Sequence, residues 1–229
     1  MTRTARTHLV TGAGSGIGEA LARRLVERGD DVVVVARSSA RADELRRDLP
    51  GATALVADLA DPTTVDALDL PEELDSVVHA AGVVDLGPVA DLSAASWAEQ
   101  LTVNLVAPAA LTRVALPALR RGRGTVVFVN SGAGLSANPQ WSAYAASKHG
   151  LRALADSLRA EEAGHGVRVS TVYPGRTATS MQEKVHRQEG KEYDASQWTR
   201  PETVAATILH VLDLPRDATV SDVTVRPAG

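Results

Sequence analysis

The sequence contains no cysteine, which excludes disulfide bonds, thiolate metal ligands and cysteine nucleophiles. It also has no long hydrophobic run, because the longest unbroken apolar stretch, Val32 to Ala36, is far too short to cross a bilayer. Basic residues are not in excess, since 24 lysines and arginines face 28 acidic residues and the net charge is -4. No basic-then-apolar leader precedes Leu9. We therefore expect a soluble, cytoplasmic protein that has neither nucleic acid nor membrane as a partner.

What is present is the composition of a globular protein. Hydrophobic residues make up 44% and charged residues 23% of the 229 positions, a balance that excludes general disorder. No internal repeat, low-complexity tract or linker divides the chain. The length suits one domain with a sizeable core, so we expect residues 1–229 to form a single domain.

Short β-branched runs alternate with longer stretches of helical period. Ile17, Ala20, Leu21 and Leu25 recur at helical spacing, and Gly29 is well placed to end that helix. The short β-branched runs are nearly continuous in apolar residues, which is typical of strands covered on both faces. Such strands are expected at 8–10, 32–35, 54–57, 77–78, 125–129, 167–172 and 220–225. Seven strands alternating with about six helices predict an α/β fold with a doubly wound parallel sheet.

The segment from Gly175 to Arg200 breaks this rhythm. It holds Met181, Tyr193 and Trp198 among charged residues, with no strand and only a weak helix. Long irregular segments of compact domains are often lids or binding loops, so we interpret residues 175–200 as a short substrate-loop region. A plain surface helix with a linker is the alternative.

A glycine-rich loop follows the first expected strand and opens the first expected helix. It reads Gly-x-x-x-Gly-x-Gly, with its glycines at Gly12, Gly16 and Gly18. Glycines let the backbone turn sharply and approach a pyrophosphate, whose charge is stabilised at a helix N-terminus. The position between strand and helix distinguishes this loop from a simple tight connection and predicts nucleotide binding.

The end of the second strand indicates which dinucleotide is bound. An acid near this point would hold a ribose 2′-hydroxyl. The chain instead has Ala36 followed by Arg37, while Asp30 and Asp31 lie at the other end of the strand. A small residue followed by an arginine favours a 2′-phosphate, and hence NADP(H) over NAD(H). Alternatively, Arg37 is a solvated residue that closes the strand.

Tyr144 and Lys148 lie four residues apart in an alanine-rich stretch without glycine or proline, which predicts a helix with both side chains on one face. The pKa of a free tyrosine, about 10, is too high for acid–base work at neutral pH. We expect the lysine cation to lower it. With only three tyrosines and three lysines in the chain, such a pair is uncommon by chance.

Two further polar residues gain meaning from their positions. Ser131 follows the strand at 125–129, which places its hydroxyl at a carboxyl end of the sheet, where open α/β sheets bind ligands. Asn104 lies in a helical stretch from about Ser96 to Leu119. A capping serine and a buried amide satisfied by the backbone are the structural alternatives.

Taken together, these ordered motifs resemble those of the short-chain dehydrogenase/reductase family over essentially the whole chain. The resemblance implies a Rossmann-type sheet of order 3-2-1-4-5-6-7. It implies that Tyr144 exchanges the substrate proton, that Ser131 orients the substrate oxygen, that Lys148 also holds the nicotinamide ribose, and that Asn104 supports a water-linked proton relay. With Arg37 from the argument above, the residues expected at the cofactor are Gly12, Gly14, Ser15, Gly16, Ile17, Gly18, Arg37, Asp58, Leu59, Ala81, Gly82, Tyr144, Lys148, Pro174, Gly175, Thr177 and Thr179.

One departure from the family lies after the fourth strand. Many members have Asn-Asn-Ala-Gly there, whereas this chain has His79-Ala80-Ala81-Gly82. Ala81 and Gly82 preserve the close approach to the cofactor, while the asparagine hydrogen bonds are absent. We expect the loop to keep its shape.

The sequence lacks the motifs that are typical of other enzyme classes. A serine hydrolase would place glycine two residues before its nucleophile, and neither Ser15 nor Ser131 has one there. The six histidines show neither i,i+4 pairing nor an HExxH motif, so no metal site is expected. A non-catalytic NADP(H)-binding regulator is the main non-enzyme alternative, but it would be expected to lose the tyrosine or the lysine. An epimerase or dehydratase would normally carry a larger region after Pro174-Gly175.

The sequence therefore predicts an NADP(H)-dependent oxidoreductase that interconverts a carbonyl and a secondary alcohol of a small molecule. A mixed set of residues is expected to line the substrate pocket, which suits a mid-sized, partly apolar compound: Ala133, Leu135, Asn138, Trp141, Arg176, Met181 and Trp198. The resemblance also implies a homodimer or homotetramer, formed through the helices near Asn104 and Tyr144.

Overall fold

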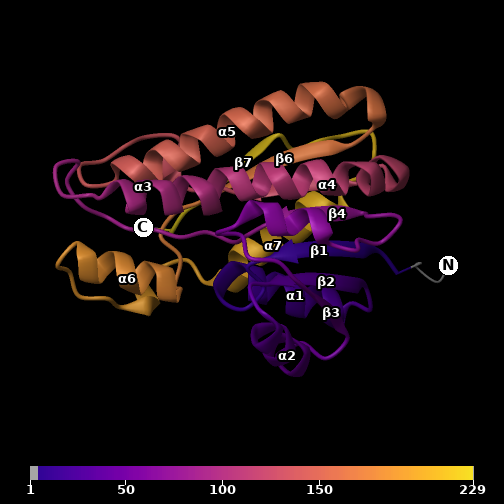
Figure 1. The fold of residues 1–229 in the computed structure, drawn as a ribbon, viewed down its shortest axis with the longest axis horizontal. Helices are drawn as coiled ribbons and strands as arrows, with labels where there is room; N and C mark the ends of the chain where they lie inside the picture. Colours follow the sequence, from indigo (N-terminus) through magenta and orange to yellow (C-terminus); the bar gives the residue numbers. More distant parts are fainter. Residues whose placement is uncertain (1–4, 229) are drawn as a thin grey trace.

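A seven-stranded parallel sheet runs through residues 5–228, the part of the chain that the computed structural model describes (Figure 1). Its order is β3-β2-β1-β4-β5-β6-β7, which confirms the predicted topology. The strands are β1 (Thr7–Thr11), β2 (Asp31–Ala36), β3 (Ala52–Val56), β4 (Ser76–His79), β5 (Thr125–Val129), β6 (Arg168–Pro174) and β7 (Asp222–Val225). The chain changes direction across the sheet between β1 and β4. The carboxyl ends of these two strands therefore flank the crevice where such sheets bind ligands.

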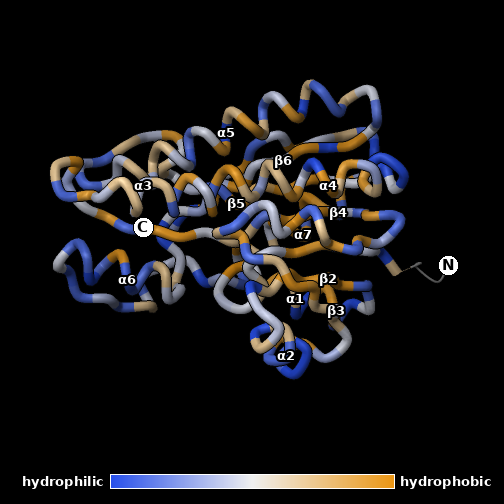
Figure 2. Tube along the Cα trace, in the orientation of Figure 1, coloured by the Kyte–Doolittle hydropathy of each residue, from blue (hydrophilic) through white to orange (hydrophobic). Residues whose placement is uncertain are grey.

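Helices cover both faces of the sheet (Figure 1). They are α1 (Gly16–Glu27), α2 (Ser39–Asp48), α3 (Ala94–Leu101), α4 (Ala107–Gly122), α5 (Ser142–Glu162), α6 (Ser180–Gln188) and α7 (Pro201–Asp213). Helices α1, α2 and α7 share one buried cluster with the sheet, and α4 and α5 share the other. Figure 2 shows the hydrophobic strands running between the more polar outer helices.

The alternation of side chains along β2 explains its unbroken apolar sequence. Val32 and Val34 pack into the cluster beneath α1 and α7, whereas Val33 and Val35 pack into the cluster beneath α4 and α5. Successive side chains of a strand point to opposite faces, so a strand covered on both sides needs apolar residues at every position.

The helical stretch expected from Ser96 to Leu119 extends over Ala94–Gly122 and includes a π-helical segment, Thr102–Val106. By length and composition alone, it is the one helix among the described residues that could cross a membrane. However, 44% of its most apolar window is buried inside the fold, and Leu111 and Leu119 pack against the sheet. This helix thus packs its apolar face into the protein core.

The segment after β6 is more regular than the sequence suggested. Helix α6 begins after Thr179, whose hydroxyl accepts a hydrogen bond from the Gln182 N–H (3.2 Å). Its first turn carries Glu183 and its last turn carries His186 and Arg187, which complement the helix dipole. Few apolar residues mark this helix, so the periodicity was too weak to predict it firmly.

Candidate active site

The predicted catalytic residues meet at the carboxyl end of the sheet. Ser131 follows β5 closely and begins a short 3-10 helix, Gly132–Gly134, while Tyr144 and Lys148 lie one turn apart near the start of α5. The Ser131 hydroxyl lies beside the Tyr144 phenol. The Ser131 Oγ also accepts from the Ala133 N–H (3.1 Å), so the capping interpretation of this serine holds as well.

Burial controls the protonation of both Tyr144 and Lys148. The two residues are 6% and 4% exposed. Burial raises the pKa of Tyr144 to about 12, against a smaller lowering by Ser131. It lowers the pKa of Lys148 to about 8. The predicted lowering of the tyrosine pKa is therefore wrong for this structure, because the loss of water around the phenol outweighs its favourable contacts.

The lysine ammonium is held by the end of β5. Lys148 Nζ donates to the carbonyl of Val129 (3.1 Å) and lies 5.8 Å from the centre of the Tyr144 ring. Among the described contacts, Nζ makes no hydrogen bond to the phenol oxygen, so the two side chains present separate polar groups.

Asn104 lies in the π-helical segment and clamps the loop after β4. Its Oδ1 accepts from the Val83 N–H (2.8 Å), and its Nδ2 donates to the Val83 carbonyl (2.9 Å) and to Ser147 Oγ (3.0 Å). The alternative prediction, that Asn104 is a buried amide satisfied by the backbone, is confirmed by its two bonds to Val83. Ser147, which the sequence did not single out, links this clamp to α5. π-Helical segments inside α-helices are frequent at functional sites.

The glycine loop turns tightly against the end of β4. Gly12 and Gly16 adopt positive φ values of 69° and 58°. A Cβ on Gly12 would lie only 2.7 Å from the Ala81 backbone nitrogen. Thr11 Oγ1 accepts from the Ala80 and Ala81 N–H groups (both 3.1 Å), which joins the two loops without the asparagines common in the family.

The N-terminus of α1 suits a phosphate group. Ser15 precedes the helix, but its side chain makes no capping hydrogen bond. The N–H groups of the first turn, from Gly16 to Gly18, therefore remain available to an anion. Thr179 lies over this turn, since a Cβ on Gly16 would be 2.9 Å from the threonine methyl group. The residues present thus fit a dinucleotide pyrophosphate.

Two arginines follow β2 near this loop. Arg37 is exposed and makes no hydrogen bond or ion pair with another described residue. Arg41, one helical turn further on, donates from Nη2 to the Gly14 carbonyl (2.9 Å) and pairs with Glu44. Arg41 was not predicted from the sequence, although its i+4 spacing from Arg37 at the start of a helix indicates it.

The remaining predicted cofactor residues lie in the loops after β3, β4 and β6 and differ in burial. A Cβ on Gly82 would lie 3.2 Å from Asn104 Oδ1 and 3.8 Å from both Lys148 Nζ and the Met181 methyl group. Asp58 is exposed and accepts from the Ala60 N–H within its own turn (3.0 Å), while Leu59 packs partly into the core. The others lie at the end of β6 and just beyond it: Pro174, Gly175, Thr177 and Thr179.

Helix α6 contributes Val185 and Met181 to the apolar surroundings of Tyr144. Val84, Ala133, Tyr144, Ala145 and Val185 form a buried apolar cluster, against which Trp141 and Met181 pack. Next to it lies a polar cavity of about 340 Å³. It is lined in part by Asn138, Trp141, Arg176 and Glu189.

Of the expected pocket residues, Ala133, Trp141 and Met181 belong to the apolar cluster, and Asn138, Trp141 and Arg176 line the polar cavity. The Arg176 guanidinium lies over the Trp198 ring, with 5.4 Å between its Cζ and the ring centre. Leu135 is exposed at 40%.

The chain is similar to known proteins along most of its length. The family described as short chain dehydrogenase matches residues 6–190. The dehydrogenase/reductase SDR family protein 7-like of Drosophila melanogaster is 34% identical, with 96% of this chain and 74% of that protein covered. L-fucose dehydrogenase of Bos taurus is 33% identical, with 77% of this chain and 68% of that protein covered.

A solved structure shares both the fold and part of the sequence. It is a putative NAD(P)-dependent gluconate 5-dehydrogenase from Beutenbergia cavernae with NADP bound at low occupancy. The TM-score is 0.82 at 31% identity, over 96% of this chain and 94% of that one. Together with the glycine loop and the sheet order, these similarities show that the chain belongs to the short-chain dehydrogenase/reductase family of oxidoreductases.

Proposed function

We propose that this protein is an NADP(H)-dependent oxidoreductase that interconverts a carbonyl and a secondary alcohol, with Tyr144 as the general acid and base. The observation that carries the proposal is the convergence of Ser131, Tyr144 and Lys148 beside the glycine loop. Bound NADPH would supply the hydride, and the protein supplies position and charge.

Each side chain has a separate task in carbonyl reduction. Tyr144 is protonated at neutral pH because its pKa is raised to about 12, so it is ready to donate a proton to the substrate oxygen. Ser131 positions that oxygen through its hydroxyl, and the Lys148 ammonium favours the developing negative charge. Asn104 keeps the loop after β4 in place and supports a water-linked proton relay.

The protein would hold NADP(H) through backbone and basic groups. The first turn of α1 takes the pyrophosphate, Lys148 takes the nicotinamide ribose, and the exposed Arg37 takes the 2′-phosphate. A guanidinium forms paired, charge-assisted hydrogen bonds with phosphate. The Beutenbergia cavernae relative, which holds NADP, adds support to this choice of cofactor.

The substrate class follows from the surroundings of Tyr144. The apolar cluster of Val84, Val185, Met181 and Trp141 favours a compound with hydrocarbon next to the carbonyl. The adjoining polar cavity of about 340 Å³ leaves space for a polar substituent. We infer a mid-sized cytoplasmic metabolite, processed by a homodimer or homotetramer.

A cofactor-consumption assay tests this proposal. The purified protein is incubated with NADPH, and separately with NADH, against a panel of ketones, aldehydes, quinones and diketones, while absorbance of the reduced nicotinamide is followed. We expect turnover of at least one carbonyl class with a preference for NADPH. Binding of NADPH without turnover of any member of the panel would instead favour the non-catalytic regulator.

A further inference from the structure

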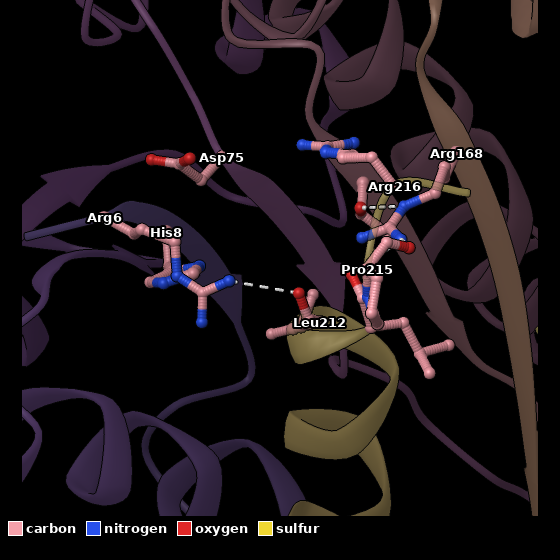
Figure 3. A pocket seen from close by; sticks show the side chains of 9 residues that line it. Arg6, His8, Asp75, Arg168, Leu212, Pro215 and Arg216 are labelled. Atoms are coloured by element: carbon pink, nitrogen blue, oxygen red, sulfur yellow. Dashed lines mark hydrogen bonds between the residues drawn. The ribbon is translucent and has the colours of Figure 1, made fainter. Parts of the chain in front are cut away.

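A second polar cavity lies at the amino ends of the strands, whereas the glycine loop lies at their carboxyl ends. It has a volume of about 270 Å³ and is bordered by residues at the amino ends of the strands and by the chain after α7 (Figure 3). Arg6 and Asp75 immediately precede β1 and β4, Arg168 begins β6, and Arg216 follows α7. We call the cavity formed by these four residues the arginine pocket.

The charges of the arginine pocket are unbalanced. Asp75 is the one carboxylate among the residues that line it, against three guanidinium groups. Its Oδ2 already accepts a hydrogen bond from the Thr7 N–H (2.8 Å). Arg6 is paired with Asp213 beside the cavity, whereas Arg168 and Arg216 form no ion pair with another described residue. Burial lowers the pKa of Arg168, and the nearby charges of Arg216 and Arg6 lower it further. Like charges are thus held together in a partly dry site, an arrangement that a bound anion would stabilise.

Two of the arginines also have hydrogen-bond donors to spare. Arg6 does not, because it donates to the Leu212 carbonyl (3.1 Å) and pairs with Asp213, and its remaining Nε is fully buried. Arg168 uses Nε on Thr125 Oγ1 and Nη1 on three backbone carbonyls, which leaves Nη2 without a described acceptor. Arg216 makes no hydrogen bond or ion pair with any residue of the described range 5–228.

The charged groups border the opening from two sides, with Arg6 directed to the Leu212 carbonyl at the end of α7. In Figure 3, Arg6 and Asp75 stand on one side and Arg168 and Arg216 on the other, with Leu212 below. A role of Arg168 in anchoring the loop after α7 explains its carbonyl contacts. It does not explain why Arg216, which has no partner among the described residues, borders the same cavity.

We propose that the arginine pocket binds a small oxyanion, either free phosphate or the phosphate group of a small phosphomonoester. Guanidinium groups arranged around a cavity match the several acceptor oxygens of such an anion. Pockets for drug-sized ligands hold roughly 300–1,000 Å³, so this cavity suits a phosphate with little else attached. Binding would tie the chain between α7 and β7 to the amino end of the sheet.

Isothermal titration of the whole protein with inorganic phosphate tests the proposal. Ionic strength is kept constant with chloride, because screening would otherwise change with the titrant. We expect saturable phosphate binding to the wild type, with one site weakened at least tenfold in Arg216→Gln and any binding at the start of α1 unchanged. Arg216→Lys, which keeps the charge without the planar fork, should bind with intermediate affinity.

A control variant separates this site from other arginines. Arg47→Gln removes an exposed cation on α2 and should bind phosphate as the wild type does. Thermal melting in chloride should show that Arg216→Gln is folded, since Arg216 is exposed. Absence of saturable binding to the wild type would overturn the proposal. Unchanged phosphate binding to Arg216→Gln would overturn it as well.

Discussion

Asn104 exchanges two hydrogen bonds with the backbone of Val83: it accepts from the N–H (2.8 Å) and donates to the carbonyl (2.9 Å). Because the amide is only 1% exposed, water cannot replace either bond in the folded protein. This one side chain therefore fixes the loop between β4 and α3 against the helix that follows.

Substitution Asn104→Ala should lower the free energy of unfolding by about 2–4 kcal/mol, since it leaves the N–H and the carbonyl of Val83 unsatisfied. Urea denaturation followed by circular dichroism measures this change. Asn138→Ala, at an exposed position, is the matched control and should change stability by less than about 0.5 kcal/mol. Equal stability of the two variants would show that the Val83 clamp is unimportant.

The two arginines after β2 should affect cofactor binding differently. Arg37→Gln should weaken NADPH binding by about tenfold or more and leave NADH binding nearly unchanged, because it removes a partner of the 2′-phosphate alone. Arg41→Gln should weaken both cofactors to a similar degree, since Arg41 supports the Gly14 carbonyl of the shared loop. Fluorescence titration of the reduced cofactors distinguishes these patterns. A parallel loss of both cofactors in Arg37→Gln would contradict the assignment of the 2′-phosphate.

Lys148 should set the alkaline limit of carbonyl reduction. Its pKa is lowered to about 8 by burial, so the ammonium is present below that pH and is lost above it. Tyr144, with its pKa raised to about 12, stays protonated throughout the range. We expect kcat/KM for reduction to be level near pH 6–7 and to fall above about pH 8. A profile that stays level to pH 10 would show that the lysine charge is not required.

His79 should make the protein sensitive to acid. It is buried, stacks on Phe128 with 4.9 Å between ring centres, and contacts Thr112 Oγ1 through Nε2 (2.9 Å). Burial lowers its pKa to about 3, whereas an unfolded histidine takes up a proton below about pH 6.5. The unfolded state is therefore favoured increasingly as the pH falls from about 6.5 towards 3.

The variant His79→Asn removes this proton uptake. Between pH 7 and pH 5, its stability should fall by about 2 kcal/mol less than that of the wild type, as measured by urea denaturation at the two pH values. His210→Asn, at an exposed position of α7, should keep the wild-type pH dependence. An identical loss of stability in His79→Asn and the wild type would mean that His79 does not titrate on unfolding.

The parts of the fold that depend on local pattern were predictable from the sequence. The unbroken valines of strand β2 indicate that both of its faces are buried. The glycines at Gly12 and Gly16 indicate a tight turn, because glycine tolerates positive φ. The spacing of Tyr144 and Lys148 was sufficient to place them on one face of α5. Each of these features is encoded within a few consecutive residues.

The features that depend on distant parts of the chain were not predictable. The raised pKa of Tyr144 depends on how completely the surrounding segments exclude water from the phenol. The contact of Arg41 with Gly14 depends on how α2 lies over the glycine loop. The arginine pocket brings together Arg6, Arg168 and Arg216, and no local pattern relates these positions.

The most direct test of the central claim is the turnover of Tyr144→Phe with the best carbonyl substrate and NADPH. The substitution removes one hydroxyl group, and general acid catalysis typically contributes about 10²–10⁴-fold to the rate. We predict a loss of kcat in this range with NADPH affinity within about twofold of the wild type. Turnover within a few-fold of the wild type, in a variant that is folded and binds NADPH, would contradict the assignment of Tyr144 as the proton donor.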